Sequence, residues 1–400
     1  MALATEPLII VGAGPVGLTL ALALAESGIA VRVFEAEADI AQDLRASTFH
    51  PPTLDLLERF GITGELLAQG LKCPDWQTRL HPSGKQARFD LSVLVGETAH
   101  PYRLQCEQWR LSRSLLSRLT SHRLVQVHFN ARVVEVFQDD SQVRATVQTV
   151  HGQQSFSAPY LVGCDGARSV VRQSMGVAFA GKTYPETTIL VATTFPFHEH
   201  LAGLSNVNYC WHEAGANFSL LRLPALWRVS LYPPQDRPIE EALTDGAIRA
   251  ALATIVPQAA AAEVIALRPY RVHQRIAARY RVGRLLLAGD AAHLNSPAGG
   301  MGMNGGVHDA LNLAEKLAVV VQGGSDDLLD LYQRQRQPIA RDQIIAQADA
   351  NRRRMRETDP QRRRESLARL QAIAADRDKL KAHLMKSSMI DGLRQAAAIS

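Results

Sequence analysis

The chain has 400 residues, of which 46% are hydrophobic, and a formal net charge of +5. It is too long for one small core, so we expect two domains or one domain with large insertions. Four widely spaced cysteines without a CxxC pair argue against a disulfide framework and a zinc site, and favour a reducing, cytoplasmic location. We expect no metal site, no signal peptide and no membrane span, because the apolar runs are short or interrupted.

The positive charge is concentrated near the C-terminus. Residues 351–400 contain ten Arg and three Lys against six acidic residues. Arginine runs of this kind can bind nucleic acids or anionic membranes. Acidic residues are interleaved with them, however, and no aromatic residue that could stack on bases follows Tyr332. We therefore interpret the tail as a solvated helical surface, and expect no nucleic-acid or membrane partner.

The N-terminal segment predicts a strand, loop, helix and second strand. Residues 8–11 form a continuous apolar run, which is typical of a buried parallel strand. The sequence GAGPVG follows at 12–17 and opens an apolar helical stripe that ends at Gly28. A strand over 30–34 then ends at Glu35.

The rest of the chain alternates strands and helices, then becomes β-rich and finally helical. The other expected elements are a helix over 52–70, short strands over 75–104, a helix over 107–121, strands at 125–129 and 132–136, a buried strand over 158–163, a β-rich segment over 179–275 with one helix near 239–255, a core strand over 284–288 and helices after 306. No repeat or low-complexity linker separates them, which indicates interleaved domains.

The GAGPVG segment fits the GxGxxG pattern of a dinucleotide-binding loop. Its first glycine allows a tight turn, the second lets the backbone approach a pyrophosphate, and the third lets the helix pack closely on the strand. The positive end of the helix favours phosphate charge. Glu35 is placed to accept hydrogen bonds from ribose hydroxyls, and its charge disfavours a 2′-phosphate. FAD or NAD is therefore expected rather than NADP.

Two further junctions between a strand and an acid favour FAD over NAD. They are GCDGARSVVR at 163–172 and GDAAHLNSPAGGMGMN at 289–304. Reduced flavin carries negative charge near N1 and the C2 carbonyl, which free N–H groups at a helix start stabilise. Glycines in the second junction let the backbone come close, and Asp290 can accept from a ribityl hydroxyl.

These motifs together resemble the FAD-dependent aromatic hydroxylases of the para-hydroxybenzoate hydroxylase fold, the class A flavoprotein monooxygenases. The resemblance covers residues 7–345, with GAGPVG, the Asp165-Gly166 pair and the Gly289-Asp290 pair in family order. It implies an α/β fold, α+β overall, in which a Rossmann-like FAD-binding domain is interleaved with a β-sheet substrate domain. The implied division is 1–75, 102–178 and 276–345 for the FAD-binding domain, 76–101 and 179–275 for the substrate domain, and 346–400 for C-terminal helices that pack on the core or on a second subunit, as in a homodimer.

The resemblance also implies individual cofactor residues. Arg45 corresponds to an arginine that contacts FAD, Gln105 to a glutamine near the ribityl chain, and Val134 to a backbone contact with adenine. Asp165 corresponds to a cofactor position and can also cap the helix that begins near Ser169. The full expected set is Gly12, Gly14, Pro15, Val16, Gly17, Glu35, Ala36, Arg45, Gln105, Val134, Asp165, Gly289, Asp290, Pro297, Gly300, Gly302, Met303 and Asn304.

The implied reaction is the hydroxylation of a phenol or related aromatic ring. In the family, NADH or NADPH reduces FAD, O2 forms a flavin C4a-hydroperoxide, and one oxygen passes to the ring. The cofactor carries out the difficult step, so no catalytic triad is required. The choice between NADH and NADPH stays open, because Glu35 belongs to the FAD site.

Substrate contacts are expected from the β-rich segment and from the loop after Arg45. The candidates are His50, Tyr209, Arg222 and Tyr232. Arg222, in the apolar stretch FSLLRLP, would either pair with a carboxylate or phenolate or point to solvent. His50 would either contact substrate or be a hydrogen-bonded loop histidine.

Two other functions stay open on the sequence. One is a non-hydroxylating flavoprotein, a redox module that docks a partner through the basic tail. The other is a membrane-associated hydroxylase that acts on a quinone precursor.

Overall fold

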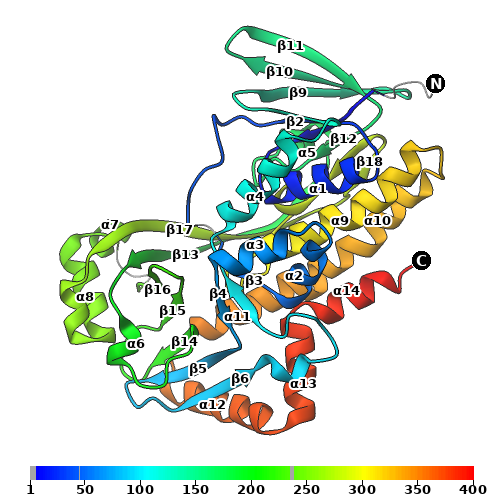
Figure 1. Cartoon of the computed structure of the whole chain (residues 1–400). Coiled ribbons are helices and arrows are strands. Elements are labelled where there is room, and N and C mark those ends of the chain that lie inside the picture. Colours follow the sequence, from blue (N-terminus) through cyan, green and yellow to red (C-terminus); the bar gives the residue numbers. More distant parts are fainter. Residues whose placement is uncertain (1–5, 45, 235–237) are drawn as a thin grey trace.

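The computed structural model describes residues 6–44, 46–234 and 238–400. It is a mixed α/β fold with several sheets and a helical C-terminus, which confirms the expected fold class. Figure 1 shows two parts, each centred on a sheet, with helices packed beside them. The division into domains at specific residues stays a proposal.

The first part is built on a six-stranded sheet with the order β18-β19-β12-β1-β2-β8. The strands from β19 to β8 are parallel, and β18 joins the edge antiparallel. Strand β1 is buried on both faces, which explains its uninterrupted apolar sequence. The strands are β1 (Leu8–Val11), β2 (Val31–Phe34), β8 (Val125–His128), β12 (Leu161–Gly163), β18 (Arg281–Val282) and β19 (Leu285–Leu287).

Helices flank this sheet, and α1 packs against both α4 and α9. The single helix expected over 52–70 is wrong. Gly61 has a φ of +67°, a left-handed conformation that separates α2 from α3. The helices of this part are α1 (Pro15–Glu26), α2 (Pro51–Glu58), α3 (Ile62–Gln69), α4 (Gln108–Thr120), α5 (Val170–Ser174), α9 (Gly302–Val321) and α10 (Asp327–Ile339).

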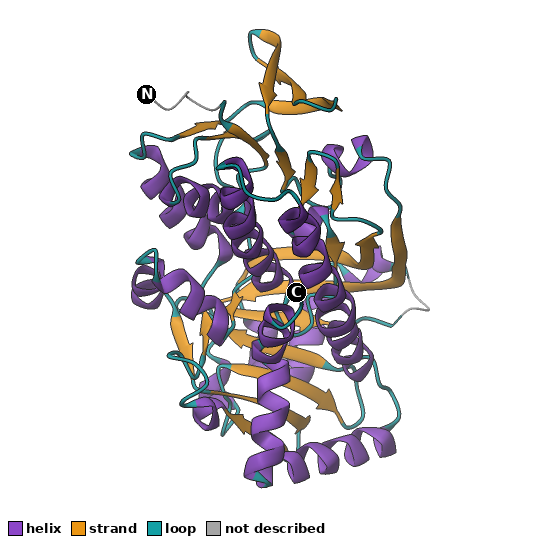
Figure 2. Cartoon of the chain, turned by 90° about the vertical axis from the view of Figure 1, so that its right-hand side faces the viewer, coloured by secondary structure: helices purple, strands orange, loops and turns teal. Residues whose placement is uncertain are grey.

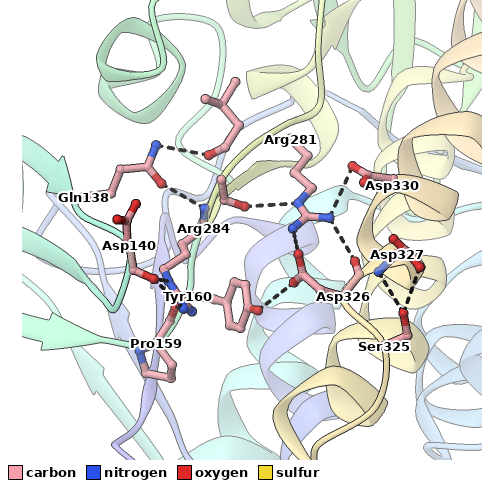
Figure 3. A network of polar contacts seen from close by, with 12 residues as sticks. Gln138, Asp140, Pro159, Tyr160, Arg281, Arg284, Ser325, Asp326, Asp327 and Asp330 are labelled. Atoms are coloured by element: carbon pink, nitrogen blue, oxygen red, sulfur yellow. Dashed lines mark hydrogen bonds and ion pairs between the residues drawn. The ribbon is translucent and has the colours of Figure 1, made fainter.

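An antiparallel ribbon of β9 (Arg132–Gln138), β10 (Val143–Thr149) and β11 (Gly152–Ala158) projects from the first part (Figure 1). Figure 3 shows the polar contacts at its base. Gln138 Oε1 accepts from the Arg284 N–H at 2.8 Å, and Tyr160 donates to Asp326 Oδ1 at 2.7 Å. Arg281 pairs with the same aspartate. These contacts join the ribbon to the β18–β19 hairpin and to the start of α10.

The second part is an eight-stranded sheet with the order β20-β17-β13-β16-β15-β14-β5-β6. All neighbours are antiparallel except β14 and β5. We call it the large sheet. Its strands are β5 (Asp75–His81), β6 (Gln86–Asp90), β13 (Phe179–Thr193), β14 (Val207–His212), β15 (Phe218–Arg222), β16 (Trp227–Leu231), β17 (Val264–Ala277) and β20 (His293–Leu294), and a small sheet of β3 (Thr48–Phe49), β7 (Arg103–Gln105) and β4 (Leu71–Cys73) lies between the two parts.

One face of the large sheet carries its own apolar cluster beneath α8. The one helix expected near 239–255 is two helices, because Thr244 begins a new one by accepting a hydrogen bond from the Ala247 N–H at 3.3 Å. The elements on this side are α6 (Phe197–His200), α7 (Ile239–Ala242), α8 (Asp245–Ile255) and the 3-10 helix η2 (Pro257–Ala261).

The C-terminal helices pack on this chain's own core. Leu367, Leu380 and Leu384 join a buried cluster with Trp76 and Phe89. In Figure 1 these helices run along the β5–β6 edge of the large sheet and then return toward the first part, and Figure 2 shows that the chain ends in a helix near the middle of the view. The elements are η4 (Ala340–Ile345, a π-helical turn), α11 (Ala346–Met355), α12 (Pro360–Ala375), α13 (Arg377–Ser387) and α14 (Ile390–Ala397).

Candidate cofactor and substrate site

A cavity of about 660 Å³ lies between the two parts, and we call it the main cavity. One wall is formed by the loops that follow β1, β12 and β19, at the carboxyl ends of these parallel strands, where α/β proteins bind ligands. The opposite wall is the inner face of the large sheet. The expected cofactor residues that line the cavity are Gly12, Gly14, Pro15, Val16, Glu35, Ala36, Asp165, Asp290, Pro297, Gly300, Gly302 and Met303.

The glycines of the N-terminal loop have different surroundings. A Cβ at Gly12 would lie 2.5 Å from the Cys164 carbonyl oxygen, and a Cβ at Gly17 would lie 2.0 Å from the Gly12 carbonyl oxygen. A Cβ at Gly14 would meet no atom within 4 Å. Gly14 lines the main cavity at the start of α1, so a side chain there would occupy ligand space. This is the cradle that a pyrophosphate requires at a helix N-terminus.

Glu35 connects this loop to the second strand. Its carboxylate accepts from the Ala13 N–H at 2.7 Å and from the Glu37 N–H at 3.0 Å. It lines the main cavity as well. The carboxylate therefore supports the glycine loop and retains lone pairs that can accept from a ribose hydroxyl.

Asp165 occupies the corresponding place after β12. Its Oδ2 accepts from the Val170 and Val171 N–H groups at 2.7 and 3.3 Å. Its Oδ1 is buried without a hydrogen-bond partner among the described residues, and burial raises the pKa of this carboxyl. Ser169 provides the N-cap of α5 by accepting from the Arg172 N–H at 2.9 Å. A buried acceptor on a cavity wall fits a hydroxyl-bearing ligand.

The loop before α9 is held in one shape by Asn304. Its amide donates to the Thr48 and Gly300 carbonyls at 2.8 and 2.7 Å and accepts from the His50 N–H at 3.0 Å. Gly300 has a φ of +68°, and a Cβ there would lie 2.8 Å from the Thr48 Cβ. Asn304 itself does not line the main cavity. It supports the loop that forms the wall through hydrogen bonds on the side away from the cavity.

His50 also supports this loop, and it does not line the main cavity. Its ring is buried, and Nε2 lies 2.8 Å from the Gly299 carbonyl oxygen. A carbonyl only accepts, so Nε2 carries the proton. Burial, together with the charge of Arg103, lowers the pKa of His50 to about 3. Of the two roles considered for His50, the geometry places it in the hydrogen-bonded loop role.

Several other expected cofactor residues lie outside the cavity wall. Gln105 is buried and donates to Thr48 Oγ1 at 2.9 Å, so it touches the cavity only through its neighbours. Val134 is 40% exposed, whereas Val133 lines the cavity. Gly17 and Gly289 pack within the fold: a Cβ at Gly289 would lie 2.9 Å from Val16 Cγ2. Arg45 lies outside the described residues.

The substrate candidates on the large sheet divide by strand alternation. Tyr209 and Tyr232 line the main cavity. Arg222 does not line it, so of the two alternatives for Arg222 the geometry does not support the substrate contact: its guanidinium lies 5.9 Å from the Trp227 ring centre, on the opposite face. Arg228 was not among the residues expected from the sequence, although the alternation in WRVSLY places it beside Tyr232 on the inner face. Arg228 donates to Ser47 Oγ at 2.6 Å, and burial lowers its pKa.

The arginine run of the tail is only partly a solvated surface. Arg353, Arg362 and Arg364 are exposed, as expected, whereas Arg352 and Arg356 line the main cavity. Arg352 pairs with Glu186, and Arg356 donates to the Thr187 carbonyl at 2.9 Å. The expectation is therefore wrong for Arg352 and Arg356, because α11 lies across the cavity and presents one of its faces to it. It is also wrong for Arg363 in the next helix, which is 4% exposed and donates to the Glu357 carbonyl at 2.8 Å.

A second cavity of about 290 Å³ adjoins the first, and we call it the side cavity. Tyr209, Gly299, Met301 and Met355 belong to the walls of both. The remaining lining residues are Trp76, Thr78, Arg103, Asp342, Ala346, Gln347, Ala350, Asn351, Arg354, His383, Lys386 and Ser387. The two cavities together offer space for a large cofactor and for a small second ligand beside it.

The described residues contain no group of three or more His, Cys, Asp or Glu side chains that could hold a metal ion. Within the same part of the chain, no helix is long and apolar enough to cross a membrane. All four cysteines are free thiols.

Comparisons with known proteins show which family the chain resembles as a whole. The family model of the FAD binding domain matches residues 5–348. The para-nitrophenol 4-monooxygenase of Pseudomonas sp. strain WBC-3 is 37% identical over 395 residues, which cover 97% of each chain. The 6-hydroxy-3-succinoylpyridine 3-monooxygenase of Pseudomonas putida strain S16 is 34% identical and covers 83% of this chain and 84% of its own. The crystal structure of p-nitrophenol 4-monooxygenase from Pseudomonas putida DLL-E4 superposes with a TM-score of 0.89 at 33% identity, over 97% of this chain and 98% of that chain.

Proposed function

Because the chain belongs to the FAD-dependent aromatic monooxygenases, we propose that it uses NADH or NADPH and O2 to hydroxylate a small phenol. The family membership confirms the resemblance seen in the sequence. The observation that carries the proposal is the main cavity, which joins the glycine loop, Asp165 and the loop before α9 to the inner face of the large sheet. The redox-module and quinone-precursor alternatives are not favoured, because relatives matching 97% and 83% of the chain are named as monooxygenases of small aromatic compounds.

The residues on the first wall fit FAD. Gly14 and the start of α1 would receive the pyrophosphate, Glu35 the adenosine ribose, and Asp165 and Asp290 the hydroxyls of the ribityl region. The first N–H groups of α9, which begins at Gly302, would face the pyrimidine edge of the flavin, together with Gly300 in the loop before it. When bound, FAD supplies the redox chemistry of oxygen activation.

The large sheet would hold the aromatic substrate. Tyr209 and Tyr232 supply hydroxyl groups on the inner face, and burial raises the pKa of the Tyr232 phenol, so it stays protonated and donates a hydrogen bond. Arg228 lies on the same face. A guanidinium near a bound phenol favours the phenolate, which is the more electron-rich form of the ring. These side chains therefore position the ring and raise its reactivity.

The test is oxygen transfer by the purified, FAD-loaded protein. NADH and NADPH oxidation and O2 consumption are followed with a panel of phenols, and products are analysed after reaction under 18O2. The proposal expects one phenol to accelerate pyridine-nucleotide oxidation and to yield a product with one labelled oxygen atom. If no phenol in the panel is oxygenated while the nucleotide is oxidised, the hydroxylase function is wrong.

Two further parts of the proposal concern the whole molecule. The four free thiols support a cytoplasmic location. A homodimer stays a proposal as well, but it would use a surface other than the apolar faces of α12 and α13, which are buried on this chain's own core. Light scattering after size-exclusion chromatography tests it directly.

A further inference from the structure

The side cavity is unusual in its buried hydrogen-bonding groups. Trp76, Thr78 and Arg103 line it and are 4%, 0% and 3% exposed. Trp76 Nε1, Thr78 Oγ1 and Arg103 Nε have no hydrogen-bond partner among the described residues. Buried donors are normally satisfied, so three in one small cavity indicate a polar ligand that accepts hydrogen bonds.

The side cavity is also strongly cationic. Arg103, Arg354 and Lys386 contribute to its wall, and the one carboxylate among its described lining residues, Asp342, accepts two hydrogen bonds from Arg341. The same field acts on the neighbouring His383. Burial, followed by the charges of Arg354 and Arg103, lowers the pKa of His383 to about 4, which leaves this ring neutral. An anion or an oxygen-rich acceptor therefore suits the cavity.

The Arg103 side chain and the backbone that carries Arg354 are both held in place by the surrounding fold. The Arg103 guanidinium lies 5.0 Å from the centre of the Trp76 ring. Arg354 lies on α11, whose end is tied to the large sheet: Trp211 Nε1 donates to the Arg354 carbonyl oxygen at 2.8 Å. Asn217 donates to the next carbonyl, that of Met355, at 2.9 Å. A guanidinium presented to a cavity from a fixed backbone favours planar groups with two acceptor oxygens, which match its fork of N–H donors.

We propose that the side cavity binds a planar substituent with two acceptor oxygens on the aromatic substrate, such as a nitro or carboxylate group, through Arg103 and Arg354. The ring would lie where the two cavities share Tyr209, Gly299 and Met301, with its substituent directed away from the main cavity. The inference rests on the proposed function, since it assigns one end of that substrate. It makes these arginines specificity-determining residues.

The test measures binding to the oxidised, FAD-loaded protein without any pyridine nucleotide, by titrating the flavin absorbance. The ligands are 4-nitrophenol, 4-hydroxybenzoate and 4-methylphenol. We expect the wild type to bind at least one of the first two about tenfold or more tightly than 4-methylphenol. Arg354→Met should reduce this ratio to within about twofold, and Arg354→Lys should give an intermediate ratio. The change in ratio between proteins cancels differences in phenol acidity.

Arg353→Met is the matched control, because Arg353 is the adjacent residue on α11 and its side chain is 68% exposed. It should retain the wild-type ratio. Arg103→Met should act like Arg354→Met; if this buried substitution prevents folding, Arg354→Met alone decides. The inference is overturned if the wild type shows no preference or if Arg354→Met retains it. A preference without any oxygenated product would support this assignment and refute the hydroxylase function.

Discussion

Arg336 Nε lies 2.7 Å from Asp309 Oδ1, and both side chains are excluded from solvent. The other oxygen of Asp309 accepts from His293 Nε2 at 2.8 Å and from the Gly289 N–H at 3.2 Å. Asp309 on α9 is thus joined to α10 and to the glycine that precedes Asp290. Despite burial, which raises it, the charges of Arg336 and His293 lower the pKa of Asp309 to about 2.

We expect Asp309→Asn to lower the free energy of unfolding by about 3–5 kcal/mol, because it leaves the buried Arg336 charge without a counterion. Urea denaturation of the apoprotein measures the change. The control is Asp342→Asn, which removes a pair whose side chains are 62% and 55% exposed, and should cost less than about 1 kcal/mol. Equal losses in the two variants would contradict the importance assigned to Asp309.

Gly14→Leu should abolish FAD retention without destabilising the apoprotein. The new side chain would extend into the main cavity, where a Cβ meets no protein atom within 4 Å. The φ of Gly14 is −71°, so leucine adopts the backbone conformation without strain. We expect the ratio of flavin to protein absorbance to fall at least tenfold, and the unfolding free energy of the apoprotein to change by no more than about 0.5 kcal/mol.

Gly17→Ala provides the contrast. Its Cβ would lie 2.0 Å from the Gly12 carbonyl oxygen, so α1 must shift from β1, and both stability and FAD content should fall. If Gly14→Leu retains full FAD occupancy, the cofactor does not pass over Gly14, and the proposed pyrophosphate position is wrong.

The sequence predicted the first wall of the cavity well because its signals are local. A strand, a glycine loop and a helix follow each other within a few residues, so the apolar run 8–11 and the GAGPVG after it predict β1, the turn and the start of α1. The same holds for the loop that ends in Asn304. What the spacing could not reveal is which loop residues face the cavity and which, like Asn304, hold the loop from behind.

The parts of the site that come from α11 and the large sheet were predicted less well, because they depend on how elements far apart in the sequence pack together. Arg353 and Arg354 are adjacent in one arginine run, yet one is exposed and the other lines the side cavity. The rotation of α11 that separates them is set by contacts with Trp211 and Asn217, more than 100 residues away. For Arg222 the sequence left two alternatives open, and the cavity distinguishes them: Ser219 and Leu221 of β15 line the main cavity, so alternation places Arg222 on the other face of the sheet.

Buried neutral histidines should make the fold sensitive to acid. Burial is the main cause that lowers the pKa of His308 to about 3, against about 6.5 in the unfolded chain. The unfolded state therefore binds more protons between these values. The stabilising contribution is fully present above pH 6.5 and is lost as the pH falls toward 3, at about 1.4 kcal/mol per pH unit.

Urea denaturation between pH 7.5 and 4.5 measures this slope. His308→Gln should lower the slope by about 1.4 kcal/mol per pH unit. The substitution also changes the contact with Thr53 Oγ1 at 2.9 Å, which would lower the stability at every pH without changing the slope. The exposed His151 supplies the control variant His151→Gln, whose slope should equal that of the wild type. An unchanged slope in His308→Gln would mean that His308 is protonated in the folded state.

Tyr209 and Arg222 lie on the neighbouring strands β14 and β15, and their side chains are on opposite faces of the sheet. Tyr209 lines both cavities, whereas Arg222 lines neither. Tyr209→Phe should raise the KM for the phenol substrate about three- to tenfold, the range expected for loss of a hydrogen bond of about 0.7–1.4 kcal/mol. Arg222→Met should change KM by less than about twofold. Titrations of the flavin absorbance measure substrate binding directly and so separate an effect on binding from a change in kcat. A larger effect of Arg222→Met than of Tyr209→Phe would show that the substrate lies on the other face of the sheet.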